Sequence, residues 1–245
     1  MPSTDIVTAA VLVIGDEILS GRTKDKNSGT IASHLTEIGI RLREVRVVAD
    51  IETEIVAALD ALRARYTYVF TTGGIGPTHD DITADAVAKA FGVSIGVSPD
   101  AEAILKTYYD GRGLELTDAR RRMARIPAGA SLVENRISGA PGFMLGNVIV
   151  MAGIPDIMAV MLEAVTPLLE TGARMLTATL LINRPESEIA ATLEAHQRRY
   201  PDVAMGCYPF LFEGRPASEL VLRSTSPKRL DDAAAMLQKE LNRLA

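Results

Sequence analysis

The sequence is poor in several residue types on which common protein classes depend. It has a single cysteine, Cys207, which excludes an internal disulfide and the zinc sites that are built from several cysteines. It has no tryptophan and only 5 phenylalanines and 6 tyrosines, so a platform of aromatic side chains for stacking nucleic-acid bases is not expected. Its longest apolar runs, such as Ala9–Ile14, are far shorter than the ~18 residues that span a bilayer, so we expect no membrane association.

Positive charge is not in excess either. Lys and Arg number 26 against 31 Asp and Glu, which gives a formal net charge of −5. A mildly acidic chain is a poor candidate for sequence-independent binding, so we expect no nucleic-acid partner. The first residues lack the basic and apolar regions of a secretion signal, which predicts a cytoplasmic protein.

Apolar residues are plentiful, at 47% of the chain, and they follow alternating strand and helix patterns. Short β-branched runs predict strands at 6–14, 42–48, 66–70 and 148–151. Apolar positions three or four residues apart predict helices at 27–38, 52–65, 83–91 and 157–169, and a helical region at 99–123 that is broken near Gly111. This order predicts an α/β domain, with helices on both faces of a mostly parallel sheet.

The pattern changes near residue 174. Strands are expected at 176–182, 203–207 and 219–223, and helices at 186–199 and 227–244. These elements are too few for a second doubly wound sheet, so they predict a small α+β unit. We therefore expect two domains, residues 1–170 and residues 174–245.

In open parallel sheets, ligands bind beyond the carboxyl ends of the strands, so the segments that follow the predicted strands are the candidate binding loops. They bring Gly15, Asp16 and Glu17 after the first strand, Asp50 after the second, and Gly153 and Pro155 after a later one. Carboxylates from separate strands thus converge on one sheet edge. The alternative for Asp16 and Glu17 is an ordinary solvated turn.

The segment TTGGIGPTHDD, Thr71–Asp81, is the sharpest local feature. Glycines without Cβ let backbone N–H groups approach a ligand, and the N-terminus of the next helix favours an anion. We expect a phosphate cradle here, in which the candidate residues are Thr72, Gly73, Gly74, Gly76, Pro77, Thr78 and Thr83, the last also as the helix cap. The alternative is a tight strand-to-helix turn.

Asp80 and Asp81 lie inside this loop, where two carboxylates repel a phosphate unless a cation lies between them. A divalent ion such as magnesium, held by one or two carboxylates and by phosphate oxygens, resolves the conflict. Asp80 and Asp81 are therefore the candidate metal ligands. The alternative is that one of the pair only caps the following helix.

Four arginines form a basic cluster on a predicted helix, namely Arg120, Arg121, Arg122 and Arg125. A solvated helix face is the ordinary explanation of such a cluster. The alternatives are a clamp on an anionic substrate and a contact between subunits.

Three segments together resemble the molybdenum-cofactor biosynthesis fold, which is shared by the MogA/MoaB group, gephyrin-type domains and the CinA group. They are TTGGIGPTHDDITADAVAKAFG, VIGDEILSGRTKDKNS (Val13–Ser28) and ARIPAGASLVENRISGAPGF (Ala124–Phe143), and the likeness is strongest to the CinA group. The resemblance covers about residues 5–168. It implies a three-layer α/β/α domain that binds a molybdopterin or a nucleotide, with a KH-like domain after it.

The resemblance also implies site residues. Two aspartates that matter for adenylyl transfer to molybdopterin in the MogA group match Asp50 and Asp81 by motif position, which makes these two the candidate catalytic residues. Asp80 stands where that group usually has a basic residue. The pocket is therefore more acidic, which suits metal-assisted attack on a phosphoanhydride.

Three functions follow as alternatives. CinA-type proteins are associated with hydrolysis of ADP-ribose-like pyrophosphates, which implies a hydrolase that depends on magnesium or cobalt. The second is molybdopterin adenylyltransferase, and the third is a pterin- or nucleotide-binding module without turnover. The resemblance further implies a homodimer, and we expect no nicotinamide-nucleotide deamidase activity, because longer CinA members carry that activity in an extra domain.

Overall fold

The computed structural model describes residues 6–243. They form two compact units, which divide after residue 172. The sequence places this division between residues 170 and 174. Each unit has a hydrophobic core of its own, and each is described separately below.

The first unit is built on a six-stranded sheet with the order β2-β1-β3-β8-β7-β6. Four neighbouring strands are parallel: β2 (Arg41–Val48), β1 (Thr8–Ile14), β3 (Tyr68–Thr72) and β8 (Val148–Met151). Two antiparallel strands, β7 (Gly142–Leu145) and β6 (Ser131–Val133), extend the sheet beyond β8. The prediction of a mostly parallel sheet is confirmed.

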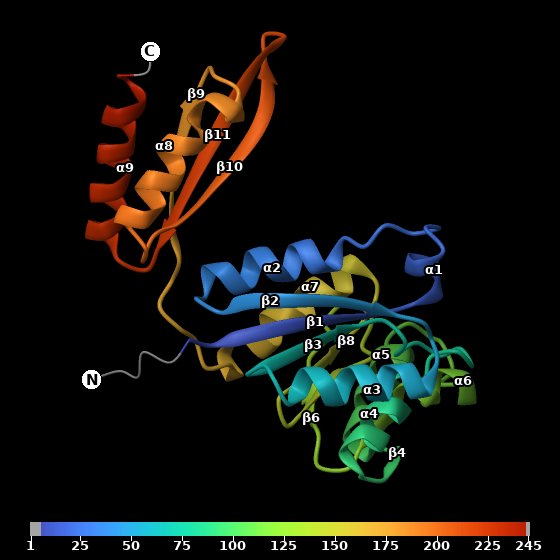
Figure 1. The fold of residues 1–245 in the computed structure, drawn as a ribbon. Coiled ribbons are helices and arrows are strands. Elements are labelled where there is room, and N and C mark those ends of the chain that lie inside the picture. The colour runs from blue at the N-terminus through green and yellow to red at the C-terminus, as the bar shows by residue number, and fades with distance from the viewer. Residues whose placement is uncertain (1–5, 244–245) are drawn as a thin grey trace. The chain divides into compact units, whose positions relative to one another are not determined.

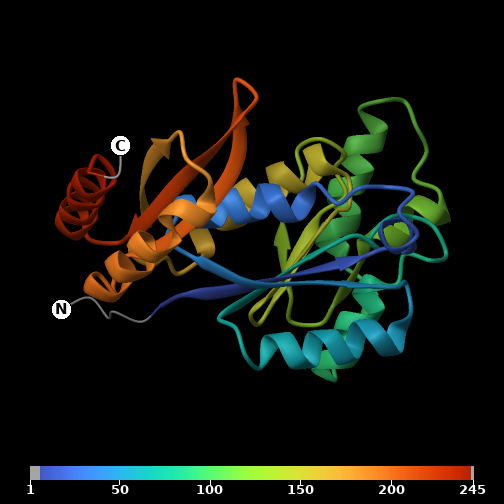
Figure 2. The ribbon, with the colours of Figure 1, turned by 45° about the horizontal axis from the view of Figure 1, so that its top comes forward.

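Helices cover both faces of this sheet (Figures 1 and 2). Alternate side chains of β1 point to opposite cores, as the period of a strand requires. Leu12 packs with the helices α3 (Glu52–Arg63), α4 (Thr83–Phe91) and α5 (Pro99–Asp110), whereas Val11 packs with α2 (Asn27–Glu37) and α7 (Pro155–Val165). Three layers result, which confirms the expected α/β/α architecture.

Several short elements are not predicted by the sequence patterns. The strands β4 (Ile95–Val97), β5 (Arg125–Pro127) and β6 have three residues each, too few for a period of two to be recognised. The helix α1 (Asp16–Leu19) lies where a loop was expected. The predicted helical region 99–123 consists of α5, the short α6 (Asp118–Arg121) and a 3₁₀ turn, η1 (Arg122–Ala124).

The second unit is a three-stranded antiparallel sheet with two helices. Its strands are β9 (Leu176–Ile182), β10 (Ala204–Phe212) and β11 (Arg215–Ser224), in the order β10-β11-β9. The helices α8 (Glu186–Arg199) and α9 (Pro227–Leu241) contribute Ile189 and Leu237 to the core with Leu220 and Leu222 of β11. The α+β prediction is confirmed, although β10 and β11 form a longer hairpin than expected.

The helices of both units are short, and the longest, α9, has 15 residues. Within residues 6–243, none combines the length and the apolar character that a membrane crossing requires.

Candidate functional site

The register of the parallel strands brings four loops to one edge of the sheet. Val13 of β1 pairs with Val47 of β2 and with Thr72 of β3, and Thr72 pairs with Met151 of β8. All four strands therefore end at nearly the same level. A cavity of about 650 Å³ opens beyond these ends. Its glycines, prolines and carboxylates are Gly15, Glu17, Asp50, Gly73, Gly74, Gly76, Pro77, Asp80, Asp81, Gly153 and Pro155. Its apolar part includes Ile14, Ile75, Met123, Ile157 and Met161.

The glycine loop leaves β3 in a backbone conformation that side chains disfavour. Gly73 has φ +105° and Gly74 has φ +66°. A Cβ on Gly73 would lie 2.1 Å from the carbonyl oxygen of Ile14, and one on Gly74 would lie 2.2 Å from Thr83 Oγ1. The end of β3 thus passes so close to the end of β1 that only glycine fits.

Thr83 fixes this loop from the helix that follows it. Its hydroxyl donates to the Gly73 carbonyl at 2.9 Å, and its amide donates to the Gly74 carbonyl at 3.0 Å. The prediction that Thr83 caps the helix is wrong, because Thr83 is the first residue of α4 and Ile82 occupies the cap position. The hydroxyl holds the loop instead.

Asn27, at the start of α2, ties two binding loops together. Its Nδ2 donates to Thr72 Oγ1 at 2.9 Å and to the Gly153 carbonyl at 2.8 Å, so it links the ends of β3 and β8. The residue is buried, and its Oδ1 has no hydrogen-bond partner among the described residues. Sequence analysis assigned Asn27 no such role, since a lone asparagine at a helix start is usually a cap.

The carboxylate of Asp50 accepts a hydrogen bond from the Asp16 amide at 2.9 Å. Burial raises the pKa of Asp50 above its usual value, and the nearby charges of Asp16, Glu17 and Asp80 raise it further, whereas the Asp16 amide lowers it. The carboxylates that follow β1, β2 and β3 therefore share one electrostatic environment, as their positions in the sequence predict.

Asp81 is held within its own loop. Its Oδ2 accepts hydrogen bonds from the Thr78 amide at 2.8 Å and from the Thr78 hydroxyl at 2.5 Å. Asp80 is exposed, and the Thr78 hydroxyl and the backbone amide of Asp80 lower the pKa of its carboxyl group. No side chain caps α4, so the alternative in which one aspartate serves as its cap is wrong.

The predicted site residues fall into two groups. Eleven of them line the cavity: Gly15, Glu17, Asp50, Gly73, Gly74, Gly76, Pro77, Asp80, Asp81, Gly153 and Pro155. The other four do not line it. Three of these hold residues that do: Asp16 bonds Asp50, Thr78 bonds Asp81, and Thr83 bonds Gly73. The fourth, Thr72, accepts a hydrogen bond from Asn27, which also lies outside the lining. Sequence analysis did not assign a role to the lining residues Thr23, Tyr109, Asn135 and Ser138. Three of them, Thr23, Asn135 and Ser138, lie in segments that carry the family resemblance.

Asp80 and Asp81 suit a metal ion whose remaining coordination positions are filled by a bound ligand. In residues 6–243 no three or more His, Cys, Asp or Glu side chains are grouped so that they could hold a metal by themselves. Asp80 and Asp81 both line the cavity next to the glycine loop, and Mg²⁺ commonly takes one or two carboxylates together with phosphate oxygens and water. These two carboxylates therefore suit a metal ion that is also bound by the phosphate oxygens of a ligand.

Comparison with known proteins decides the family. Residues 10–171 match the model of the probable molybdopterin binding domain, and residues 174–245 match that of the FAD synthase middle domain. A CinA-like protein of Desulfosudis oleivorans is 33% identical over 96% of this chain and 64% of its own length. The crystal structure of CinA from Thermoplasma acidophilum, described as of unknown function, is 35% identical, with a TM-score of 0.60, over 65% of this chain and 97% of its own.

The chain belongs to the molybdopterin-binding-domain family, in its CinA-type group. A protein of Aeropyrum pernix is 34% identical to this CinA-type chain over 96% of the chain and 91% of the relative. The chain spans only 56% to 64% of the length of three CinA-like relatives. The activities of those longer proteins are therefore not carried over as a whole.

The close approach at Gly73 predicts a large effect of a single methyl group. Gly73→Ala should destabilise this CinA-type chain by about 1–3 kcal/mol more than Gly21→Ala. Gly21 also has a positive φ, of +73°, but a Cβ there meets nothing within 4 Å. Both variants place an alanine at a positive φ, so the difference between their free energies of unfolding, measured by urea denaturation, reports the contact with the Ile14 carbonyl oxygen. Equal losses of stability in the two variants would contradict the close approach of β3 to β1.

The raised pKa of Asp50 predicts a pH-dependent gain of stability on its removal. The native carboxyl group keeps its proton to a higher pH than the unfolded one, whose value is near 3.8, so native stability falls as the pH rises through this window. Asp50→Asn should therefore be more stable than the parent at pH 7, and the gain should vanish toward pH 3.8.

Asp202 provides the matched control for this experiment. Its pKa is lowered by Arg229, which binds both of its oxygens at 2.6 and 2.7 Å. Asp202→Asn should be less stable than the parent at pH 7, and its deficit should shrink as the pH falls. Denaturant titrations at several pH values test both signs, and a loss of stability in Asp50→Asn at pH 7 would contradict the account of Asp50.

Proposed function

We propose that this chain hydrolyses a nucleotide pyrophosphate such as ADP-ribose, with a divalent metal, magnesium or cobalt, as its cofactor. The observation that carries the proposal is the meeting of a glycine loop with the carboxylates of Asp50, Asp80 and Asp81 in one cavity. A glycine loop before a helix suits a phosphate, and carboxylates beside a phosphate require a cation.

Each residue has a proposed role. The backbone of Gly73, Gly74 and Gly76 would lie against one phosphate. Asp80 and Asp81 would hold the metal, whose chemistry would be the polarisation of a phosphoryl oxygen. Asp50 takes a proton from the attacking water, a task that its raised pKa favours. The new bond joins the water oxygen to phosphorus while the bond to the bridging oxygen breaks, which yields AMP and ribose 5-phosphate from ADP-ribose.

A second candidate is adenylyl transfer to molybdopterin. The family match to a probable molybdopterin binding domain favours it, and so does the apolar part of the cavity around Ile75 and Met161, which suits a flat ring system. In this reaction a group on the pterin replaces water as the attacking group. A module that only binds a pterin or nucleotide is the third candidate, and it predicts binding without any product.

The proposal also includes the cellular location and the oligomeric state of the protein. We infer a cytoplasmic protein from the sequence and a homodimer from the resemblance to the family. Small nucleotides or pterins are its proposed partners, and nucleic acid is not among them, because the chain carries a net charge of −5.

Asp81→Asn tests the hydrolase directly. Purified protein with ADP-ribose and magnesium or cobalt should release AMP, and the variant should lose at least ~100-fold in rate, because a metal-positioning carboxylate is removed. The amide still accepts hydrogen bonds from Thr78, so the loop should keep its structure. Product release measured by chromatography gives the rate.

Asp110→Asn is the matched control, since Asp110 is exposed and pairs only with Lys106. It should turn over as fast as the parent. Equal turnover in Asp81→Asn and in the parent would place the activity elsewhere. Absence of turnover in the parent would reject the hydrolase and leave molybdopterin with ATP as the next substrate pair.

A further inference from the structure

The cavity is larger than a phosphate and a metal ion require. Its volume of about 650 Å³ lies in the range of sites that enclose a whole small-molecule ligand. Its lining includes Tyr109, Asn135 and Ser138, which have no part in the proposed hydrolysis. These residues belong to a part of the ligand other than its phosphate.

The apolar lining of the cavity is continuous. Ile75 packs against both cores of the first unit, of which one also holds Met123 and Tyr109 and the other holds Ile157 and Met161. Ile75, Met123 and Tyr109 are only partly buried, and all three line the cavity. A flat ring that covered them would remove apolar surface from water, which is favourable.

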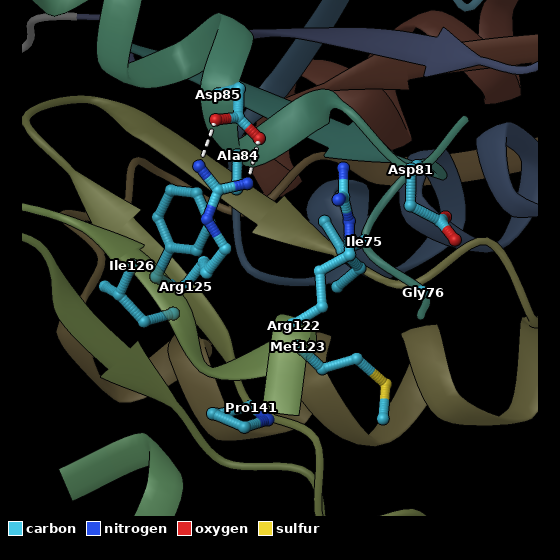
Figure 3. Close-up of a pocket in the computed structure, with 12 residues that line it drawn as sticks. Ile75, Gly76, Asp81, Ala84, Asp85, Arg122, Met123, Arg125, Ile126 and Pro141 are labelled. Atoms are coloured by element: carbon cyan, nitrogen blue, oxygen red, sulfur yellow. Dashed lines mark hydrogen bonds and ion pairs between the residues drawn. The ribbon is translucent and has the colours of Figure 1, made fainter. Parts of the chain in front are cut away.

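Met123 has a fixed place beside the glycine loop. It belongs to η1, and Arg125, directly after this turn, binds both oxygens of Asp85 in α4, at 2.8 and 2.6 Å. Figure 3 shows this ion pair, and it shows the Met123 side chain below Ile75, with which it lines a narrow gap. A methionine side chain is unbranched and polarisable, so it adapts to the face of a ring.

Asn135 uses its whole amide group to shape the loop that precedes β7. Its Oδ1 accepts hydrogen bonds from the amides of Ile137 and Ser138, both at 3.1 Å. Its Nδ2 donates to the Ala140 carbonyl at 2.8 Å and to Ser138 Oγ at 2.5 Å. Both donors and both acceptor positions of this buried amide are thus used within its own loop.

Ser138 is left with a free donor. Because its Oγ accepts a hydrogen bond from Asn135, its hydroxyl hydrogen points toward some other acceptor. Within residues 6–243 no such acceptor is found, and Ser138 lines the cavity. The hydroxyl therefore offers its hydrogen to an atom of the ligand.

The helix α5 holds Ser138 and Tyr109 near each other. The Tyr108 hydroxyl donates to the Ile137 carbonyl at 3.1 Å. Gly139 has φ +72°, and a Cβ there would lie 2.5 Å from Cγ of Tyr108, so the loop rests directly on this ring. Tyr109 follows in the same helix and lines the cavity.

We propose that the cavity binds a flat heteroaromatic ring of the ligand against Ile75, Tyr109 and Met123, and that the Ser138 hydroxyl donates a hydrogen bond to an acceptor on the edge of this ring. The inference rests on the proposed function, because it takes the glycine loop as the place of the phosphate. Adenine and pterins share the required chemistry, since both are flat and both carry ring nitrogens that accept hydrogen bonds. Ser138 is then the residue that determines specificity for the ring.

Titration calorimetry of the full chain with AMP and with ribose 5-phosphate, the two halves of ADP-ribose, tests the proposal. Each compound carries one phosphate, and only AMP carries a ring. AMP should bind at least ~10-fold more tightly than ribose 5-phosphate, because its base stacks on Tyr109. Ser138→Ala should weaken AMP binding by ~3–10-fold and leave ribose 5-phosphate within ~2-fold, because one hydrogen bond to the ring is lost.

Two further variants complete the test. Ser138→Cys keeps a weak donor and a weak acceptor for Asn135, and should also weaken AMP binding alone, so it carries the test if the alanine variant does not fold. Ser131→Ala is the matched control, because Ser131 is exposed on β6 and does not line the cavity. It should leave the affinity for AMP unchanged.

Neopterin, a pterin without a phosphate, distinguishes the two sources of the ring. Neopterin binding that depends on Ser138, with AMP binding that does not, would keep the ring site and assign it to a pterin. The proposal is overturned if neither compound binds the parent, if neither depends on Ser138, or if Ser138→Ala weakens ribose 5-phosphate as much as AMP.

Turnover of ADP-ribose separates this proposal from the proposed function. AMP binding that depends on Ser138, in a protein that releases no AMP from ADP-ribose, would keep the ring site and reject the hydrolase. AMP release at the parent's kcat/KM in Ser138→Ala, with the affinities for AMP and neopterin also unchanged, would keep the hydrolase and reject the ring site.

Discussion

The close approach of β3 to β1 is the constraint on which the rest of the site depends. The space beside the Ile14 carbonyl admits a hydrogen atom but no methyl group, so residue 73 is glycine. Once the chain has passed this point, the Thr83 hydroxyl and amide bond the Gly73 and Gly74 carbonyls and set the direction in which α4 leaves the sheet. The glycine loop and the carboxylates of Asp80 and Asp81, which lie between Gly74 and Thr83, take their positions from that turn.

The gathering of carboxylates in the cavity is the second organising feature. Burial and the acidic neighbours of Asp50 disfavour its ionised form, which is an energetic cost to the folded chain. Functional sites often retain such unfavourable electrostatics. A cation bound in the cavity would relieve part of this repulsion.

The sequence predicts most of the fold and every glycine and charged residue of the cavity lining. Long periodic elements such as α8 and β9 coincide with their predicted bounds, because burial of one face imposes the period. The strands β4 and β5 were not predicted, because three residues carry no periodic signal. Asn27 was not assigned as a positioning residue, because its hydrogen bonds to two separate loops arise only in the folded chain. Arg122 was named only as part of the basic cluster, for which a clamp on an anion was one alternative.

The hydrogen bonds of Asn27 have a consequence for ligand size. Because one amide group bonds the ends of both β3 and β8, these two ends cannot separate without breaking at least one of two hydrogen bonds, one of them buried and the other partly buried. The helix α1, whose Glu17 also lines the cavity, is a single turn without any buried residue. We therefore expect a ligand that widens the cavity to displace α1 before it separates the ends of β3 and β8.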